Sequence, residues 1–169
     1  DYIGQEHLVG KGAVLRKMID SGRLSSLILW GPPGVGKTTL AQIIANTLKT
    51  PFYTLSAVTS GVKDVRDVIH RAESERFFNS ASPILFIDEI HRFSKSQQDS
   101  LLGAVEKGTV TLIGATTENP SFEVIRPLLS RCQLFVLKSL SKDNLETLLH
   151  RAITKDVELS KLHITVKQD

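Results

Sequence analysis

The chain has 169 residues, of which 41% are hydrophobic, and a formal net charge of +3, which is compatible with nucleic-acid binding but not specific for it. This length suits one α/β domain with a real core and is too short for two full domains. The single cysteine, Cys132, excludes a disulfide framework and a cysteine metal cage, and no apolar run is long enough to cross a membrane. Because the chain starts at Asp1 without a methionine, we expect it to be part of a longer protein.

Apolar periodicity predicts helices that alternate with strands along most of the chain. In chain order, we expect helices at 14–21, 37–48, 62–78, 91–107 and 126–130, and one that begins at 141. The expected strands lie at 26–30, 52–56, 83–87, 110–115 and 133–137, and a loop with Asn119 and Pro120 follows the fourth of them. This alternation predicts right-handed crossovers, and hence an α/β fold with a five-stranded parallel sheet covered on both faces. Residues 140–169 are expected to begin a second, helical domain.

One loop carries the most specific chemical signal. Gly31, Gly36, Lys37 and Thr38 fit the pattern G-x-x-x-x-G-K-[ST], which binds the phosphates of a nucleotide. Glycines let backbone N–H groups approach the phosphates, Lys37 can reach the outer phosphates, and the Thr38 hydroxyl can bind Mg²⁺. An apolar strand precedes the loop and a helical pattern follows it, which disfavours a chance match. The residues that we assign to the nucleotide are Gly31, Pro32, Pro33, Gly34, Val35, Gly36, Lys37, Thr38 and Thr39.

Two carboxylates end the third expected strand. Asp88 and Glu89 follow the apolar run 84–87, where a parallel sheet places its functional site. Asp88 is placed to hold Mg²⁺ through water, and Glu89 is the natural base to orient and activate an attacking water molecule. The alternative is an ordinary acidic loop at a strand end, which the upstream phosphate loop disfavours. The sequence therefore predicts a site that binds and hydrolyses a nucleoside triphosphate with Mg²⁺.

The phosphate loop and the run Asp-Glu-Ile-His-Arg at 88–92 together resemble the AAA+ ATPases. That resemblance implies that residues 1–139 form an AAA+ nucleotide-binding core and that 140–169 begin a helical lid. It also implies that Ile3 and Gly4, in a segment that resembles the adenine-binding stretch of these proteins, lie against the adenine ring.

Two further residues receive roles from the same resemblance. Gly-Ala-Thr-Thr at 114–117 resembles the end of the strand that carries a polar sensor of the γ-phosphate, and by position we assign Thr117, with Thr116 as the second choice. Ser-Arg-Cys at 130–132 resembles the clamp-loader motif whose arginine acts on the ATP of the neighbouring subunit, which implies that Arg131 acts in trans. We interpret Arg126 as a surface charge.

Two long runs, at 86–99 and 111–122, resemble the replication-associated recombination protein A family, which includes the eukaryotic Werner-helicase-interacting ATPase. This resemblance implies a DNA-dependent homo-oligomeric ATPase that acts in recombination or rescue at stalled or gapped replication forks. Its expected partners are forked or gapped DNA, junctions of single- and double-stranded DNA, and single-strand-binding protein, with no membrane. The expected location is the cytoplasm, near the nucleoid, in a bacterium and the nucleus in a eukaryote.

Four other functions share parts of these motifs. A Holliday-junction branch-migration motor also carries Asp-Glu-Ile-His-Arg and Gly-Ala-Thr-Thr, and a sliding-clamp-loader subunit shares Ser-Arg-Cys. A small-molecule kinase would share the phosphate loop but needs an acceptor pocket and a lid rich in arginines. A structural subunit that binds nucleotide without hydrolysing it would be expected to lack part of the site, and no element is missing here.

Two further expectations concern regulation and DNA contact. Thr54 or Ser56, at the end of the second strand, could restrain Glu89 until DNA binds. The basic residues that could touch a phosphate backbone are Arg92, Lys95 and Lys107.

Overall fold

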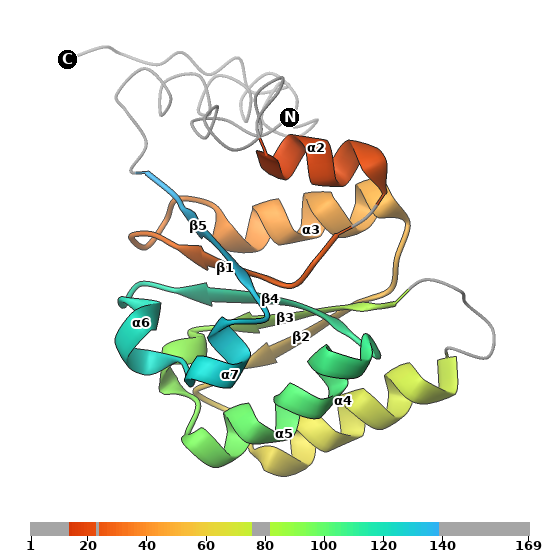
Figure 1. Cartoon of the computed structure of the whole chain (residues 1–169), viewed down its shortest axis with the longest axis vertical. Coiled ribbons are helices and arrows are strands. Elements are labelled where there is room, and N and C mark those ends of the chain that lie inside the picture. The colour runs from red at the N-terminus through yellow and green to blue at the C-terminus, as the bar shows by residue number, and fades with distance from the viewer. Residues whose placement is uncertain (1–13, 23, 76–81, 139–169) are drawn as a thin grey trace, which may run out of the picture.

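The computed structural model describes residues 14–22, 24–75 and 82–138, which form a sheet with helices on both faces (Figure 1). Five parallel strands pair in the order β2-β3-β4-β1-β5. They are β1 (Leu27–Trp30), β2 (Phe52–Ser56), β3 (Ile84–Asp88), β4 (Thr111–Thr116) and β5 (Gln133–Val136). The predicted α/β fold with a five-stranded parallel sheet is confirmed. Ile3, Gly4 and the expected lid at 140–169 lie outside the described residues.

The helices divide between the two faces of the sheet. They are α2 (Val14–Ser21), α3 (Lys37–Leu48), α4 (Val62–Glu75), the 3₁₀ turn η1 (Ile90–Arg92), α5 (Lys95–Lys107), α6 (Pro120–Glu123) and α7 (Arg126–Leu129). In Figure 1, α2 and α3 cover one face, and α4 and α5 cover the other. None of the described helices has the length and apolar character needed to span a bilayer.

Alternating apolar residues along the strands fill both cores. Leu27 and Leu29 belong to the cluster under α2 and α3, whereas Ile28 belongs to the cluster under α4 and α5. All three side chains are fully buried. A strand buried on both faces reads as a continuous apolar run, which is why its sequence showed no polar alternation.

One strand lies between the two strands that carry the main motifs. β4 lies between β3, which ends in Asp88, and β1, which precedes the phosphate loop. Trp30 of β1 pairs in register with Thr116 of β4, and Ile87 of β3 pairs with Gly114. The end of β4 therefore separates the phosphate loop from the carboxylates, and all three meet at one edge of the sheet.

The loop expected around Asn119 contains a short helix instead. The Asn119 side chain accepts a hydrogen bond of 3.0 Å from the Ser121 N–H, and Pro120 opens α6 with a backbone angle suited to a first helical turn. This N-terminal signal was present in the sequence, but a four-residue helix is too short to show apolar periodicity.

A buried glutamine ties α5 to the segment that follows β4. Gln98 is 1% exposed, and its Nε2 donates hydrogen bonds of 3.0 Å to the carbonyls of Phe93 and Glu123. Its Oε1 accepts a bond of 2.8 Å from the Ile125 N–H. One side chain thus satisfies three backbone groups of two irregular segments, which have no strand or helix ladder to join.

We predict that Gln98→Ala lowers the free energy of unfolding by about 2–4 kcal/mol, because it leaves buried backbone groups without partners. Urea denaturation of the purified protein would measure this. The matched control is Gln42→Ala, since Gln42 is exposed on α3, and it should change stability by no more than about 0.5 kcal/mol. Equal, small effects of both substitutions would contradict the structural role of Gln98.

Candidate active site

A cavity of about 400 Å³ lies where β1, β3 and β4 end. Its lining residues are Pro33, Gly34, Gly36, Lys37, Thr38, Asp88, Glu89, Ala115, Thr116 and Thr117. A larger cavity of about 680 Å³ is lined by Met18, Gly22, Leu24, Ser25, Leu48, Thr50, Ser82, Thr111 and Gln133. None of those side chains titrates or is a strong nucleophile, so the smaller cavity is the candidate site. The structure thus gathers the phosphate loop, both carboxylates and the predicted sensor around one space.

The phosphate loop has the backbone shape of an anion site. Gly34 and Gly36 have φ angles of 78° and 89°, in the left-handed region that side chains disfavour. The helix α3 begins at Lys37, and no side chain caps its first turn. Gly36, Lys37 and Thr38 line the cavity, so the positive end of the helix dipole lies beside it, which suits a phosphate group.

The Lys37 side chain folds back onto the start of the phosphate loop. Its Nζ donates hydrogen bonds of 2.7 Å to the Gly31 carbonyl and 3.0 Å to the Pro32 carbonyl. Burial lowers the pKa of Lys37, and the charges of Asp88 and Glu89 partly oppose that shift. Gly31 and Pro32 are not among the residues that line the cavity, and their carbonyl groups hold the lysine side chain.

Gly31 has a second role that the motif does not reveal. A Cβ at this position would lie 2.8 Å from the Leu137 carbonyl oxygen, so no side chain fits there. Val35 is 4% exposed and packs in the core beneath α3, and Thr39 is exposed without lining the cavity. The motif therefore combines residues that face the cavity with residues that hold the loop on the sheet.

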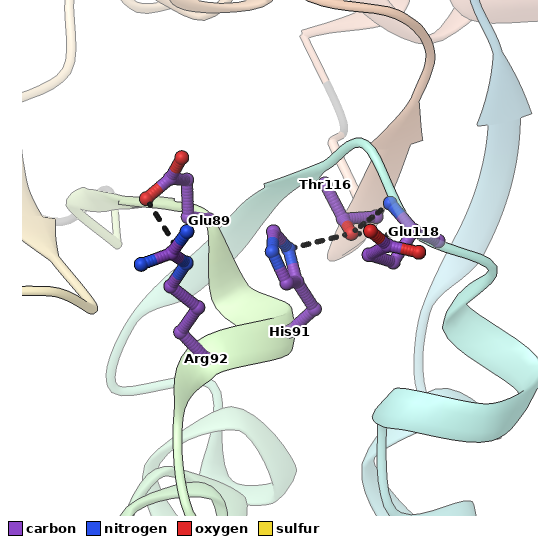
Figure 2. A network of polar contacts seen from close by, with 5 residues as sticks. All are labelled: Glu89, His91, Arg92, Thr116 and Glu118. Carbon is purple, nitrogen blue, oxygen red and sulfur yellow. Dashed lines mark hydrogen bonds and ion pairs between the residues drawn. The ribbon is translucent and has the colours of Figure 1, made fainter.

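The acidic pair leaves the sheet through a sharp turn. Glu89 has φ 54° and ψ 47°, a left-handed conformation that is strained for a non-glycine residue. This turn starts η1 and brings Arg92 back beneath the carboxylate, where Nε lies 3.6 Å from Oε2 (Figure 2). Among the described contacts, neither Thr54 nor Ser56 is bonded to Glu89, and Arg92 is its partner instead.

The end of β4 carries a small polar network (Figure 2). The Thr116 hydroxyl lies 3.0 Å from His91 Nδ1, accepts a 3.0 Å bond from the Glu118 N–H and lies 3.1 Å from the Glu118 carbonyl. A hydroxyl has one hydrogen, so when it donates to that carbonyl, His91 must donate from Nδ1. The Thr116 hydroxyl therefore already has hydrogen-bond partners within the protein. Thr117, which is exposed and lines the cavity, remains the predicted sensor.

Arg131 lies near the amino ends of the strands, whereas this cavity lies at their carboxyl ends. It precedes β5, whose first residue Gln133 pairs in register with Leu27, the first residue of β1. A strand of four residues spans about 13 Å, so Arg131 is remote from the loop that follows β1. Its side chain is 55% exposed, and its guanidinium Nη2 lies 3.6 Å from Glu106 Oε1 of α5.

Oxygen groups suited to Mg²⁺ lie within the cavity lining. Thr38 offers a hydroxyl and Asp88 a carboxylate, both hard ligands of the kind that this cation takes together with phosphate and water. Within the described ranges, no group of three or more His, Cys, Asp and Glu residues could hold a metal ion by itself. The donor set therefore fits a cation that arrives with a phosphate ligand.

Comparison with known proteins connects these features to one family. Residues 27–140 match the family described as ATPase family associated with various cellular activities (AAA). The chain is 53% identical over 152 residues to Replication-associated recombination protein A of Haemophilus influenzae, covering 90% of the chain and 34% of the relative. It is 54% identical over 153 residues to ATPase WRNIP1 of Dictyostelium discoideum, covering 90% and 17%. The chain spans about a third of the bacterial relative's length.

A solved structure has a similar fold. The RuvB Holliday junction branch migration motor of Thermotoga maritima superposes with a TM-score of 0.72 at 33% identity. The match covers 90% of this chain and 51% of that chain. These similarities agree with the expected AAA+ family and with its recombination branch.

We predict that Lys37→Met abolishes the stabilisation that ATP with Mg²⁺ gives to the folded protein, because the phosphates lose the positive charge of the partly buried Lys37. Nucleotide at 100 times its Kd should add about 2.7 kcal/mol to the parent. Thermal melting with and without nucleotide measures the difference. Lys17→Met, at an exposed position of α2, is the control and should melt like the parent with and without nucleotide. If nucleotide raised the melting temperature equally in the parent and in both variants, Lys37 would be excluded from the site.

Proposed function

Because the chain belongs to the AAA family of ATPases, we propose that its cavity holds ATP with Mg²⁺ and that the protein hydrolyses the β–γ phosphoanhydride bond. One observation carries this proposal: a phosphate loop and two strand-end carboxylates line a single cavity of about 400 Å³. ATP hydrolysis needs little covalent chemistry from the protein, so positioning and charge account for most of the catalysis.

The roles of the cavity residues follow from their chemistry. Glu89 orients the attacking water and takes its proton, and Lys37 offsets negative charge on the outer phosphates. Thr117, exposed at the end of β4, contacts the γ-phosphate region. When bound through Thr38 and Asp88, Mg²⁺ supplies further compensation of the phosphate charge.

We propose that the site is completed by a neighbouring subunit. Arg131 lies at the opposite edge of the sheet from its own phosphate loop, and its side chain is more than half exposed. An arginine so placed can meet the ATP of a second copy of the chain but not its own. An arginine finger raises kcat by a factor on the order of 10³–10⁵. An isolated subunit would therefore bind ATP and hydrolyse it slowly.

DNA is the proposed regulator of this ATPase. The relatives named Replication-associated recombination protein A support a role in replication-associated recombination. Within that role we propose rescue of stalled or gapped forks, near single-strand-binding protein, at the nucleoid of a bacterium or in the nucleus of a eukaryote. Arg92 and Lys95 are exposed around the start of α5 and are the proposed phosphate contacts. Lys107 is also exposed, but it lies about 18 Å from Lys95 along the helix and cannot join the same contact.

A branch-migration motor is the second candidate, because the RuvB structure superposes with a TM-score of 0.72. The two functions differ in the DNA that stimulates hydrolysis. A fork or gap should be preferred by a fork-rescue ATPase, and a four-way junction by a branch-migration motor. ATPase rates with each DNA at equal concentration distinguish them.

We predict that Glu89→Gln and Arg131→Ala each lower DNA-stimulated ATP hydrolysis of the full-length protein by at least about 100-fold. Mixing the two variants should restore activity, because each supplies the group that the other lacks. Arg126→Ala, an exposed arginine of the neighbouring helix α7, is the control and should act like the parent. Full activity of Arg131→Ala at all protein concentrations would refute the shared site.

We also predict that Lys95→Ala weakens DNA binding to a similar extent for all sequences and lowers the slope of log affinity against log salt by about 1, as loss of one phosphate contact requires. Fluorescence anisotropy with a forked oligonucleotide between 50 and about 200 mM salt would measure the slope. Lys17→Ala serves as the control. An unchanged slope in Lys95→Ala would remove this residue from the DNA surface.

A further inference from the structure

An ion pair joins the end of α5 to the arginine that precedes β5. Glu106 Oε1 lies 3.6 Å from Arg131 Nη2, and the two side chains are 41% and 55% exposed. The pair lies outside the cavity lining, so it is independent of the residues that surround the nucleotide of the same subunit.

Glu106 occupies a position that does not favour its own helix. It lies in the last turn of α5, immediately before Lys107 and the left-handed Gly108 that ends the helix. The carboxyl end of a helix carries partial negative charge, so an acidic side chain there is locally unfavourable. The Arg131 guanidinium is the described group that compensates this carboxylate.

The backbone of Arg131 is already fixed by other contacts. Its N–H donates a 3.1 Å bond to the Leu128 carbonyl, and α7 is held against α5 through the buried Gln98, which bonds to Ile125. What remains variable is the long arginine side chain. One contact to Glu106 restricts its direction and leaves most of its five N–H donors available.

We propose that Glu106 is a positioning residue that orients the Arg131 guanidinium of one subunit toward the ATP of the next. This inference rests on the proposed function, since it assumes that Arg131 acts in trans. It adds a group that never touches the nucleotide and acts only through the arginine.

The first test is Glu106→Gln in the full-length protein with forked DNA. We expect kcat to fall about tenfold, because a displacement of about 1 Å at a reacting centre is enough for a loss of that order. ATP affinity should stay unchanged, and the melting temperature should stay equal or rise slightly because an unfavourable helix-end charge is removed. Glu106→Asp, which keeps the charge on a shorter side chain, should have an intermediate rate.

The matched control is Glu73→Gln. Glu73 also lies in the last turn of a helix, α4, is 56% exposed, and lies 4.0 Å from the His70 imidazole. Its loss should leave kcat at the parent value. If removing a helix-end carboxylate had a general effect, kcat would fall alike in Glu106→Gln and Glu73→Gln, and the proposal would be overturned.

The second test separates a role in trans from a role within one subunit. Glu106→Gln mixed with Glu89→Gln should regain activity, because the Glu89→Gln subunits offer well-oriented arginines to intact cavities. Glu106→Gln mixed with Arg131→Ala should not regain it, because neither protein supplies a working arginine. A purely structural defect would not produce this pattern.

Each result decides one proposal. A parent-like Glu106→Gln, or a slow one that Glu89→Gln subunits fail to rescue, overturns the positioning role while the shared site stands. If Glu89→Gln and Arg131→Ala themselves fail to complement, the shared site is wrong and the role of Glu106 falls with it.

Discussion

The parallel pairing of β1 with β4 is the interaction on which the candidate site depends. It aligns Trp30 with Thr116, and a further bond of 3.1 Å from the Gly31 N–H to the Thr116 carbonyl extends the pairing into the phosphate loop. Because β3 pairs with the other side of β4, Asp88 ends at the same edge. Loop, sensor and carboxylates are thus brought together by backbone hydrogen bonds, with no direct bond between their side chains required.

Local sequence signals predicted the parts of this site, and long-range pairing determined how they fit together. The strand before Gly31, the helix that begins at Lys37 and the acidic strand end could be predicted because each depends on neighbouring residues. The insertion of β4 beside β1 could not, since strand order depends on contacts between distant segments. The pairing of Glu89 with Arg92, and of Thr116 with His91, likewise required the left-handed turn at Glu89, which no residue type signals.

The same sheet explains why one subunit is not expected to complete its own site. Parallel strands place every carboxyl end at one edge and every amino end at the other. The phosphate loop follows the end of β1, whereas Arg131 precedes the start of β5, the neighbour of β1. The proposed division of the catalytic groups between subunits is therefore a consequence of strand direction rather than of any special loop.

The contacts that fold this domain and those that serve its proposed chemistry differ in strength. Gln98 is buried and satisfies three backbone groups, so its loss affects the fold. The Glu89–Arg92 and Glu106–Arg131 pairs are each more than a third exposed, and such surface pairs contribute only about 0–1 kcal/mol to stability. Loss of either pair therefore costs the fold little, and what each pair determines is the direction of a charged side chain. The sheet and the buried glutamine provide stability, whereas these exposed contacts set the orientation of the groups that serve the proposed chemistry.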